Sequence, residues 1–227
     1  MSDIERVKLK FDQPVIVLGG GNLNLTVLRP LVERGYPVVA ADGAADQART
    51  LGVRLNAIIG DFDSVQDTAV FEPSVAQFKI PEQETTDFEK CLYSVEAPLF
   101  ICFGMLGKRF DHSLAALHTV TRYCDEKHII LIDEHDASLG VNGDFEMALP
   151  SQCLISIYPL VPTQFDHSEG LLYPLDGLLL EAGKRIGTSN ETNAERVKMK
   201  PRDAAQARYL VTLPITQLDA MIYTVAN

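Results

Sequence analysis

The sequence predicts a mixed α/β protein in two parts: an N-terminal, doubly wound, mostly parallel sheet domain and a C-terminal antiparallel β-sandwich domain. Two observations lead to this prediction. The first half alternates short apolar runs with amphipathic stretches, whereas the second half, after about Glu134, consists of short strand-like pieces punctuated by Gly and Pro. We therefore expect an α/β domain over residues 1–134 and a β-sandwich over residues 135–227.

The apolar runs of the first half lack the alternation of a half-exposed strand, which is typical of strands buried on both faces of a parallel sheet. They are residues 15–18, 38–41, 57–59, 99–103 and 129–132. Helical segments fit between them at residues 23–34, 44–51, 86–95 and 111–124. This βαβ order predicts a parallel sheet with helices on both faces.

The second half has the spacing of a small antiparallel sandwich or barrel. Its strand-like pieces are residues 146–149, 153–159, 171–174, 178–181, 197–200 and 207–213. Long helical periodicity is not found there until the last residues.

Composition and charge limit the classes of partner. The 227 residues are 46% apolar, and 20 basic against 31 acidic residues give a net charge of -11. A long nucleic acid is therefore not expected, because a phosphate backbone demands a basic face, although a small anionic ligand is not excluded. We expect no membrane span and no signal peptide in residues 1–12. Four cysteines without a CxxC pair favour free buried thiols and a cytoplasmic location.

The sharpest polar segment is residues 58–64, where Asp61 and Asp63 lie two residues apart in a loop after a predicted strand. In an open α/β sheet, ligands bind at the carboxyl ends of the strands. Paired carboxylates there suit Mg²⁺, which bridges to substrate phosphates. The alternative is that Asp63 or Ser64 caps the following helix.

A second polar segment, residues 83–90, contains the capping box Thr86 and Glu89, which predicts a helix start. Asp87 and Lys90 lie three residues apart on the first turn of that helix. A carboxylate and an ammonium in this place can hold a metal and a phosphate together. The alternative is a solvated ion pair.

A third polar segment, residues 104–111, combines glycines with Lys108 and Arg109, which can neutralise phosphate charge, and with Asp111, which is placed to cap the next helix. It is not a Walker A loop, and residues 19–21 do not complete a dinucleotide-binding motif. Residues 19–21 are therefore either a ligand loop or a plain tight turn. The five histidines show no metal-ligand spacing, so we expect them on the surface or on helix faces.

Taken together and in this order, the segments resemble the thiamine pyrophosphokinase family. The resemblance is carried by residues 41–44, 60–64, 83–90 and 104–112, and by residues 187–191, which look like the Ser-Asn motif of the family's second domain. It implies transfer of a pyrophosphoryl group from ATP to the hydroxyl of thiamine, with Mg²⁺, to give thiamine diphosphate and AMP. It also implies a homodimer with active sites at the interface between subunits.

The resemblance further implies roles for individual residues. Asp61, Asp63 and Asp87 would bind the metal, Lys90, Lys108 and Arg109 would hold the phosphates of ATP, Asp111 would orient Arg109 or contact the nucleotide, and Asp42 would line the same cleft. Gln83, Thr86, Ser189 and Asn190 would contact thiamine, the last two from the second domain. The expected catalytic set is Asp61, Asp63, Asp87, Lys90, Arg109 and Asp111.

The sequence departs from the family pattern in two places. Glu84 stands where many members have Asp, and the chain has no Trp, on which many members stack thiamine. Two alternatives therefore stay open: a pyrophosphokinase for another alcohol, such as a hydroxymethylpterin, and a thiamine or nucleotide sensor without catalysis. The complete set of carboxylates argues against the sensor.

Overall fold

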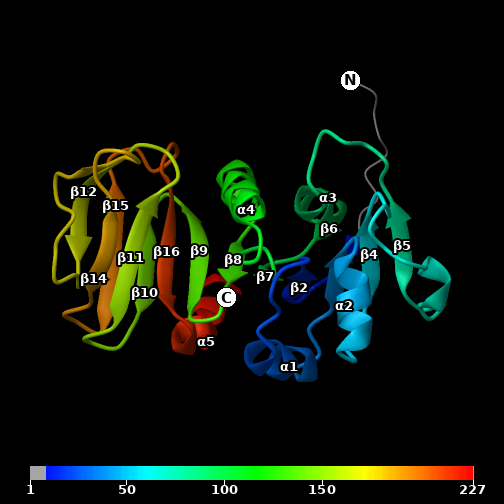
Figure 1. Ribbon diagram of the computed structural model, residues 1–227. Coiled ribbons are helices and arrows are strands. Elements are labelled where there is room, and N and C mark those ends of the chain that lie inside the picture. Colours follow the sequence, from blue (N-terminus) through cyan, green and yellow to red (C-terminus); the bar gives the residue numbers. More distant parts are fainter. Residues whose placement is uncertain (1–8, 227) are drawn as a thin grey trace. The chain divides into compact units, whose positions relative to one another are not determined.

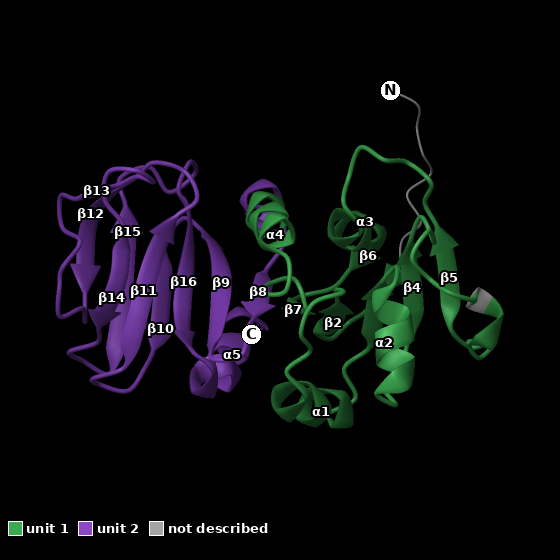
Figure 2. Ribbon diagram, in the orientation of Figure 1, with its two compact units in different colours: residues 1–119 green, residues 120–227 purple. Residues whose placement is uncertain are grey.

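The computed structural model describes residues 9–226, with the side chain of Thr68 excepted, and divides into two compact units. Unit 1 ends at Thr119 and unit 2 begins at Val120, so the boundary falls inside helix α4 (Phe110–Tyr123), as Figure 2 shows. The domain limits 1–134 and 135–227 stay a prediction. Residues 1–8, part of the segment in which no signal peptide is expected, and Asn227 lie outside the described residues.

Unit 1 is built on a parallel sheet with the strand order β7, β2, β3, β4, β5 (Figure 1). These strands are β2 (Val15–Leu18), β3 (Val38–Ala41), β4 (Ala57–Gly60), β5 (Ala76–Lys79) and β7 (Phe100–Phe103). The helices of this unit are α1 (Leu25–Glu33), α2 (Ala44–Thr50), α3 (Asp87–Ser94) and the first part of α4, with a 3₁₀ turn η1 (Thr68–Val70). A short parallel pair joins β1 (Leu9–Lys10) to β6 (Val95–Glu96).

The inner strands of this sheet are buried along their whole length, as the unalternated apolar runs predict. Strand β5 was not expected from the sequence. It pairs with β4 at the edge of the sheet, and its residues alternate between half-buried and exposed. An edge strand needs no continuous apolar run, so it gives no such signal.

Unit 2 consists of two antiparallel sheets, with the strand orders β14, β11, β16, β9, β8 and β10, β15, β12, β13. The strands are β8 (Ile129–Ile132), β9 (Asp136–Asn142), β10 (Phe145–Ala148), β11 (Leu154–Pro159), β12 (Thr163–Glu169), β13 (Leu179–Leu180), β14 (Gly187–Glu191), β15 (Arg196–Pro201) and β16 (Arg208–Pro214). The buried rings of Phe165 and Tyr209, from one sheet each, meet edge to face at 5.2 Å. The α/β class with a C-terminal antiparallel β region is therefore confirmed.

Strand β8 differs from the expected rhythm, because it pairs antiparallel with β9. The connection between the two strands is only residues 133–135, and the N–H of Asp133 donates to the carbonyl of Asp136 at 2.9 Å. A parallel pair needs a crossover of about a dozen residues or more, so a tight turn here permits only the antiparallel arrangement. After β16, the chain ends in the 3₁₀ turn η2 (Ile215–Gln217) and helix α5 (Leu218–Ala226), which contacts β10.

All four cysteines are free and buried, as expected from the sequence. Burial raises the pKa of Cys91 and Cys102 well above the usual thiol range, and it raises that of Cys124 to about 11. These thiols are therefore protonated at neutral pH and unreactive. Among residues 9–226, no helix is long and apolar enough to cross a membrane.

Candidate active site

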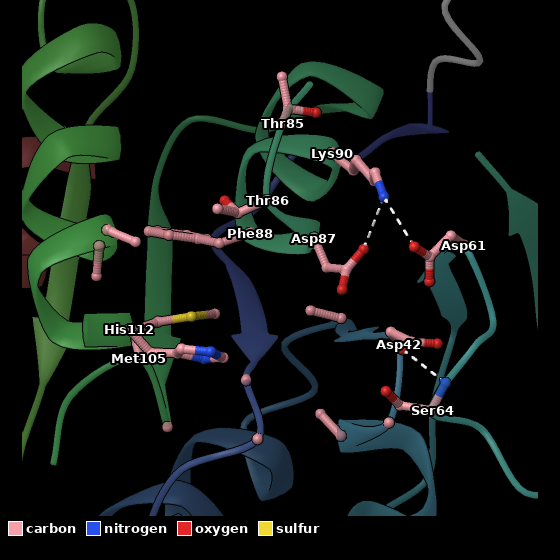
Figure 3. A pocket seen from close by; sticks show the side chains of 18 of the residues that line it. Asp42, Asp61, Ser64, Thr85, Thr86, Asp87, Phe88, Lys90, Met105 and His112 are labelled. Carbon is pink, nitrogen blue, oxygen red and sulfur yellow. Dashed lines mark hydrogen bonds and ion pairs between the residues drawn. The ribbon is translucent and has the colours of Figure 1, made fainter. Parts of the chain in front are cut away.

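A cavity of about 420 Å³ opens at the carboxyl edge of the parallel sheet in unit 1 (Figure 3). The chain reaches it directly after β2, β3, β4 and β7 and at the start of α3 and α4. This is the edge at which open α/β sheets bind ligands. Of the residues predicted from the sequence, those that line the cavity are Asp42, Asp61, Asp63, Gln83, Thr86, Asp87 and Lys90.

Asp42 follows β3 and is 3% exposed, with a left-handed backbone conformation (φ 42°). Its Oδ2 accepts a hydrogen bond from the N–H of Ser64 at 3.2 Å, but its Oδ1 is buried without a hydrogen-bond partner among the described residues. Burial, and next the charge of Asp87, raise the pKa of this carboxyl. A buried acceptor without a partner costs free energy, so this oxygen is suited to a ligand that supplies positive charge.

Gly60, at the end of β4, leaves the space that the side chain of Asp42 occupies. A Cβ at position 60 would lie 2.7 Å from the Cβ of Asp42, which is closer than real Cβ contacts come. Any side chain at this position would therefore displace Asp42. A Cβ at Gly43 would likewise lie 2.9 Å from the Cβ of Ser64, the residue whose N–H holds Asp42.

Asp61 and Asp63 occupy a tight turn after β4, in which Phe62 has a φ of 63°. The N–H of Asp63 donates to Oδ1 of Asp61 at 3.2 Å, and Nε2 of Gln83 donates to Oδ2 of Asp61 at 2.6 Å. The Gln83 hydrogen bond is the main cause that lowers the pKa of Asp61. Asp61 is therefore a fixed, ionised carboxylate at neutral pH.

Carboxylate oxygens of Asp42, Asp61 and Asp63, one from each residue, lie within 4.8 Å of one another. Three hard oxygen donors at this spacing can coordinate one divalent cation. The sequence predicted Asp61 and Asp63 for this role, with Asp87 as the third residue. In the structure, the third member of this acidic group is Asp42, whereas Asp87 accepts a hydrogen bond from Lys90.

The ion pair of Asp87 and Lys90 begins helix α3, which starts with the predicted capping box: Thr86 Oγ1 accepts from the N–H of Glu89 at 3.2 Å. Nζ of Lys90 lies 3.0 Å from Oδ1 of Asp87 and 3.8 Å from Oδ2 of Asp61. The side chain of Lys90 is only 2% exposed. The lysine is therefore buried in the cavity wall and pairs with a partly exposed carboxylate, which differs from the solvated pair that the sequence left open.

Burial acts on both members of this pair. It raises the pKa of Asp87, against the opposing effect of the Lys90 hydrogen bond. It opposes the charged form of Lys90 as well, but the hydrogen bond and charge of Asp87, together with the charges of Asp61 and Glu82, outweigh it and raise the pKa of Lys90. Lys90 is therefore a permanent positive charge in the cavity at neutral pH.

The cavity has a second, less polar end. Figure 3 shows Phe88, Met105 and His112 on one side and the carboxylates with Lys90 on the other. Ala115 and Ala116 of α4 add to this wall. No role in the site was expected for these side chains, although residues 88, 105 and 112 lie in segments that carry the resemblance. Positions 112, 115 and 116 share one face of a helix, which is the signal that could have found them. His112 is exposed, as expected for the histidines, and also lines the cavity.

Lys108, Arg109 and Asp111 lie in or next to the loop after β7 and are not among the residues that line the cavity. Arg109 donates from Nε and Nη2 to the two carboxylate oxygens of Asp111 at 3.1 and 2.5 Å, and both side chains are 64% exposed. Asp111 therefore holds the guanidinium of Arg109, and its expected role in the site stays a prediction. The ammonium of Lys108 donates to the carbonyl of Gly20 at 3.4 Å. Phosphate binding by Lys108 and Arg109 stays a prediction.

Ser189 and Asn190 belong to β14 in unit 2. Asn190 is 3% exposed, and its side chain accepts from the N–H of Tyr173 at 3.0 Å and donates to the carbonyl of Tyr173 at 2.7 Å. The side-chain amide of Asn190 therefore holds the backbone at Tyr173. Ser189 is exposed, with a φ of 59°. A contact of either residue with thiamine stays a prediction.

Comparison with known proteins finds similarity to one family. A family model described as "Thiamin pyrophosphokinase, catalytic domain" matches residues 28–132. Thiamin pyrophosphokinase 1 of Caenorhabditis elegans is 29% identical over 181 residues, which cover 71% of this chain and 74% of that protein. The chain is similar to the thiamin pyrophosphokinase family over this catalytic region. Thiamine pyrophosphokinase 1 of Arabidopsis thaliana is 28% identical over 165 residues, and this match spans only 60% of the plant protein.

The residues matched by the family model, 28–132, include the acidic group of Asp42, Asp61 and Asp63 and the loop after β7. They do not include β14. Solved structures with these names share the fold. Thiamin pyrophosphokinase from Candida albicans superposes with a TM-score of 0.74 at 14% identity, over 95% of both chains. The Geobacillus thermodenitrificans protein gives a TM-score of 0.73 at 22% identity, over 89% of this chain and 97% of that one.

Proposed function

We propose that this chain is a thiamine pyrophosphokinase, which transfers the pyrophosphoryl group of ATP to the hydroxyl oxygen of thiamine and releases AMP. One observation carries the proposal. In a chain similar to this family, a buried lysine and a close group of three carboxylates face one cavity at the carboxyl edge of the sheet. This combination suits charge neutralisation around transferred phosphate groups.

In the proposed reaction, the thiamine hydroxyl oxygen forms a bond with the β-phosphorus of ATP. The bond that breaks joins this phosphorus to the oxygen that bridges it to the α-phosphorus, and AMP leaves with that oxygen. The hydroxyl proton is released. Such chemistry needs little covalent help from the protein and depends on positioning and on stabilising charge at the phosphate oxygens.

A divalent cation fits the acidic group, because Oδ1 of Asp42 is a buried acceptor without a partner among the described residues and lies close to two further carboxylates. We propose Asp42, Asp61 and Asp63 as its ligands. Asp87 stays a candidate, since only its Oδ1 is bonded to Lys90. Mg²⁺ bound there would neutralise charge on phosphate oxygens.

The chain's own residues supply the remaining functions. The buried ammonium of Lys90 places a fixed positive charge where negative charge develops on phosphate oxygens. Gln83 holds Asp61 and, with Thr86, lines the cavity at which we propose that thiamine binds. The ring of Phe88 and the thioether of Met105 offer an apolar surface to a flat substrate ring. We propose that Arg109, whose guanidinium is held by Asp111, binds phosphate oxygens of ATP.

The homodimer and the cytoplasmic location are also proposals. The dimer rests on the resemblance to the family. Four free and buried cysteines are compatible with a reducing compartment.

The test is incubation of the purified protein with ATP, MgCl₂ and thiamine, with chromatography of the products. We expect AMP and thiamine diphosphate in equal amounts, and ADP in place of AMP would overturn pyrophosphoryl transfer. Asp63→Asn should abolish turnover and leave the fold intact, because Asp63 contributes an exposed carboxylate to the acidic group. Asp12→Asn, an exposed aspartate outside the cavity, is the matched control and should retain full activity.

The same assay separates the two alternatives. A pyrophosphokinase for another alcohol would convert a hydroxymethylpterin and leave thiamine unchanged. A sensor would bind thiamine or nucleotide in a calorimetric titration without forming AMP. The acidic group favours the catalytic function over the sensor, because charge neutralisation by a metal is what phosphoryl transfer requires.

A further inference from the structure

The Gly19–Gly21 loop after β2 borders the same cavity, and its middle residue differs from its neighbours. Gly19 and Gly20 line the cavity, but Gly19 is buried and Gly20 is exposed. The sequence left open whether these three glycines form a ligand loop or a plain tight turn. The space around each Cα decides between the two readings.

The outer glycines are required by packing. A Cβ at Gly19 would lie 2.7 Å from the carbonyl oxygen of Gly104, and a Cβ at Gly21 would lie 2.6 Å from the same oxygen. The N–H of Gly19 donates to the carbonyl of Phe103 at 2.7 Å, and that of Gly21 donates to the carbonyl of Gly104 at 2.8 Å. Gln47 of α2 fixes the carbonyl of Gly21 at 3.2 Å. The loop is therefore held rigidly against the segment after β7.

The middle glycine is not required by packing. A Cβ at Gly20 would meet nothing within 4 Å, and the backbone of Gly20 is not in the left-handed region. A plain turn therefore gives no reason for glycine at this position, since alanine fits both the space and the conformation. A side chain at position 20 would extend into open space at the border of the cavity, which Gly20 lines.

Gly20 also presents a free donor and an adjacent cation. Its N–H has no hydrogen-bond partner among the described residues, while its carbonyl accepts from the ammonium of Lys108 at 3.4 Å. An exposed N–H beside an ammonium suits an anion, and glycine lets the anion approach the backbone closely. In a chain with a net charge of -11, a free N–H next to a cation is a local exception that favours an anion.

We infer that Gly20 is a substrate-contacting residue whose N–H, together with Lys108, binds a phosphate group of the nucleotide. This inference rests on the proposed function, since it assumes that ATP occupies the cavity. Glycine at position 20 keeps the cavity open to the phosphate, whereas Gly19 and Gly21 keep the loop in place.

The test compares Gly20→Ala with Gly19→Ala and Gly21→Ala. Calorimetry measures the Kd for a non-hydrolysable ATP analogue with Mg²⁺ and for adenosine, and a thermal scan measures Tm. For Gly20→Ala we expect an unchanged or slightly higher Tm, an unchanged Kd for adenosine and a Kd for the ATP analogue raised about 10-fold or more. Gly19→Ala and Gly21→Ala should lower Tm, because each added Cβ meets a backbone oxygen.

Lys108→Gln provides the second arm. It should also raise the Kd for the ATP analogue and leave the Kd for adenosine unchanged. The double variant with Gly20→Ala should lose less binding free energy for the ATP analogue than the sum of the two single losses, because both residues act on one phosphate.

Several results would overturn the inference. If Gly20→Ala binds the ATP analogue with the Kd of wild type, Gly20 does not contact the phosphate. If the Kd for adenosine rises as much as that for the ATP analogue, the contact is with the nucleoside and not with the phosphate. If the Tm of Gly20→Ala falls as that of Gly19→Ala does, there is no free space for a side chain at position 20. Wild-type protein that binds no ATP analogue overturns the proposed function itself, and the phosphate assignment with it.

Discussion

Replacing Asp42 with Asn should stabilise the metal-free protein while weakening its binding of Mg²⁺. The exchange keeps the size of the side chain and the acceptor for the N–H of Ser64. It removes a buried negative charge that lies close to two other carboxylates, and it puts an N–H₂ donor in place of the unpartnered Oδ1. The variant therefore removes a cost of folding and a ligand of the cation at the same time.

The size of the effect follows from the unpartnered oxygen. A buried acceptor without a partner costs about 1–3 kcal/mol. For a protein of this length, each kcal/mol corresponds to about 2–4 °C in Tm. We therefore expect Asp42→Asn to raise Tm by roughly 2–12 °C in EDTA at pH 7.

The pH dependence of this difference gives an independent check. Burial raises the pKa of Asp42 above its ordinary value of 3.8, so the ionised carboxyl destabilises the folded state. This penalty is complete above the raised pKa, fades as the pH falls through it, and is gone below about 3.8. The Tm advantage of Asp42→Asn should therefore shrink as the pH is lowered.

Thermal scans with EDTA and with MgCl₂ measure both effects. At a Mg²⁺ concentration 100 times the Kd, binding adds about 2.7 kcal/mol to the stability of wild type, and the variant should gain much less. Asp12→Asn is the control and should behave as wild type in both buffers. A metal-free Tm below that of wild type would refute the reasoning, because it would mean that the buried carboxylate stabilises the fold.

Two further predictions concern the charges around Asp42. Lys90→Met should destabilise the protein by about 1–3 kcal/mol in urea denaturation, because it leaves the partly buried carboxyl of Asp87 without its cation. Adding Asp87→Leu should restore part of this loss, and equal stability of the single and double variants would contradict the reasoning. The affinity for Mg²⁺, measured by calorimetry, should fall as the pH is lowered from neutral towards the raised pKa values of Asp42 and Asp87. Protonation of Asp42 and Asp87, whose pKa values are raised, removes negative charge, while Asp61, whose pKa is lowered, stays ionised; an affinity independent of pH would show that neither raised group contributes.

Much of the candidate site could be predicted because its residues are neighbours in the sequence. Asp61 and Asp63 follow a buried apolar run, and the capping box of Thr86 and Glu89 fixes where α3 begins, which places Lys90 one turn into the helix. Local pattern is sufficient for such features, because a strand end and a helix start determine which way the next few side chains point.

Other features depend on contacts between segments that are far apart in the sequence. The unpartnered oxygen of Asp42 follows from the loop after β4, about twenty residues later, whose Ser64 satisfies only one of its two oxygens. The antiparallel pairing of β8 follows from a three-residue connection that an apolar run does not reveal. The open face of Gly20 becomes visible only when the segment at Gly104 is packed beside it. Sequence periodicity contains none of these distances.

Loops at the carboxyl edge of the sheet in unit 1 contain residues with unfavourable backbone conformations. Asp42, Phe62 and Lys108 have positive φ angles of 42°, 63° and 25°, and each lies in a loop at the carboxyl edge of the sheet. Such conformations cost about 1–3 kcal/mol each and persist only where the surrounding structure determines them. Here the buried strands on which these loops begin supply that support, as does the close contact between Gly60 and Asp42. Because the cost is met when the chain folds, the carboxylates already stand together before a cation arrives, and binding need not order them.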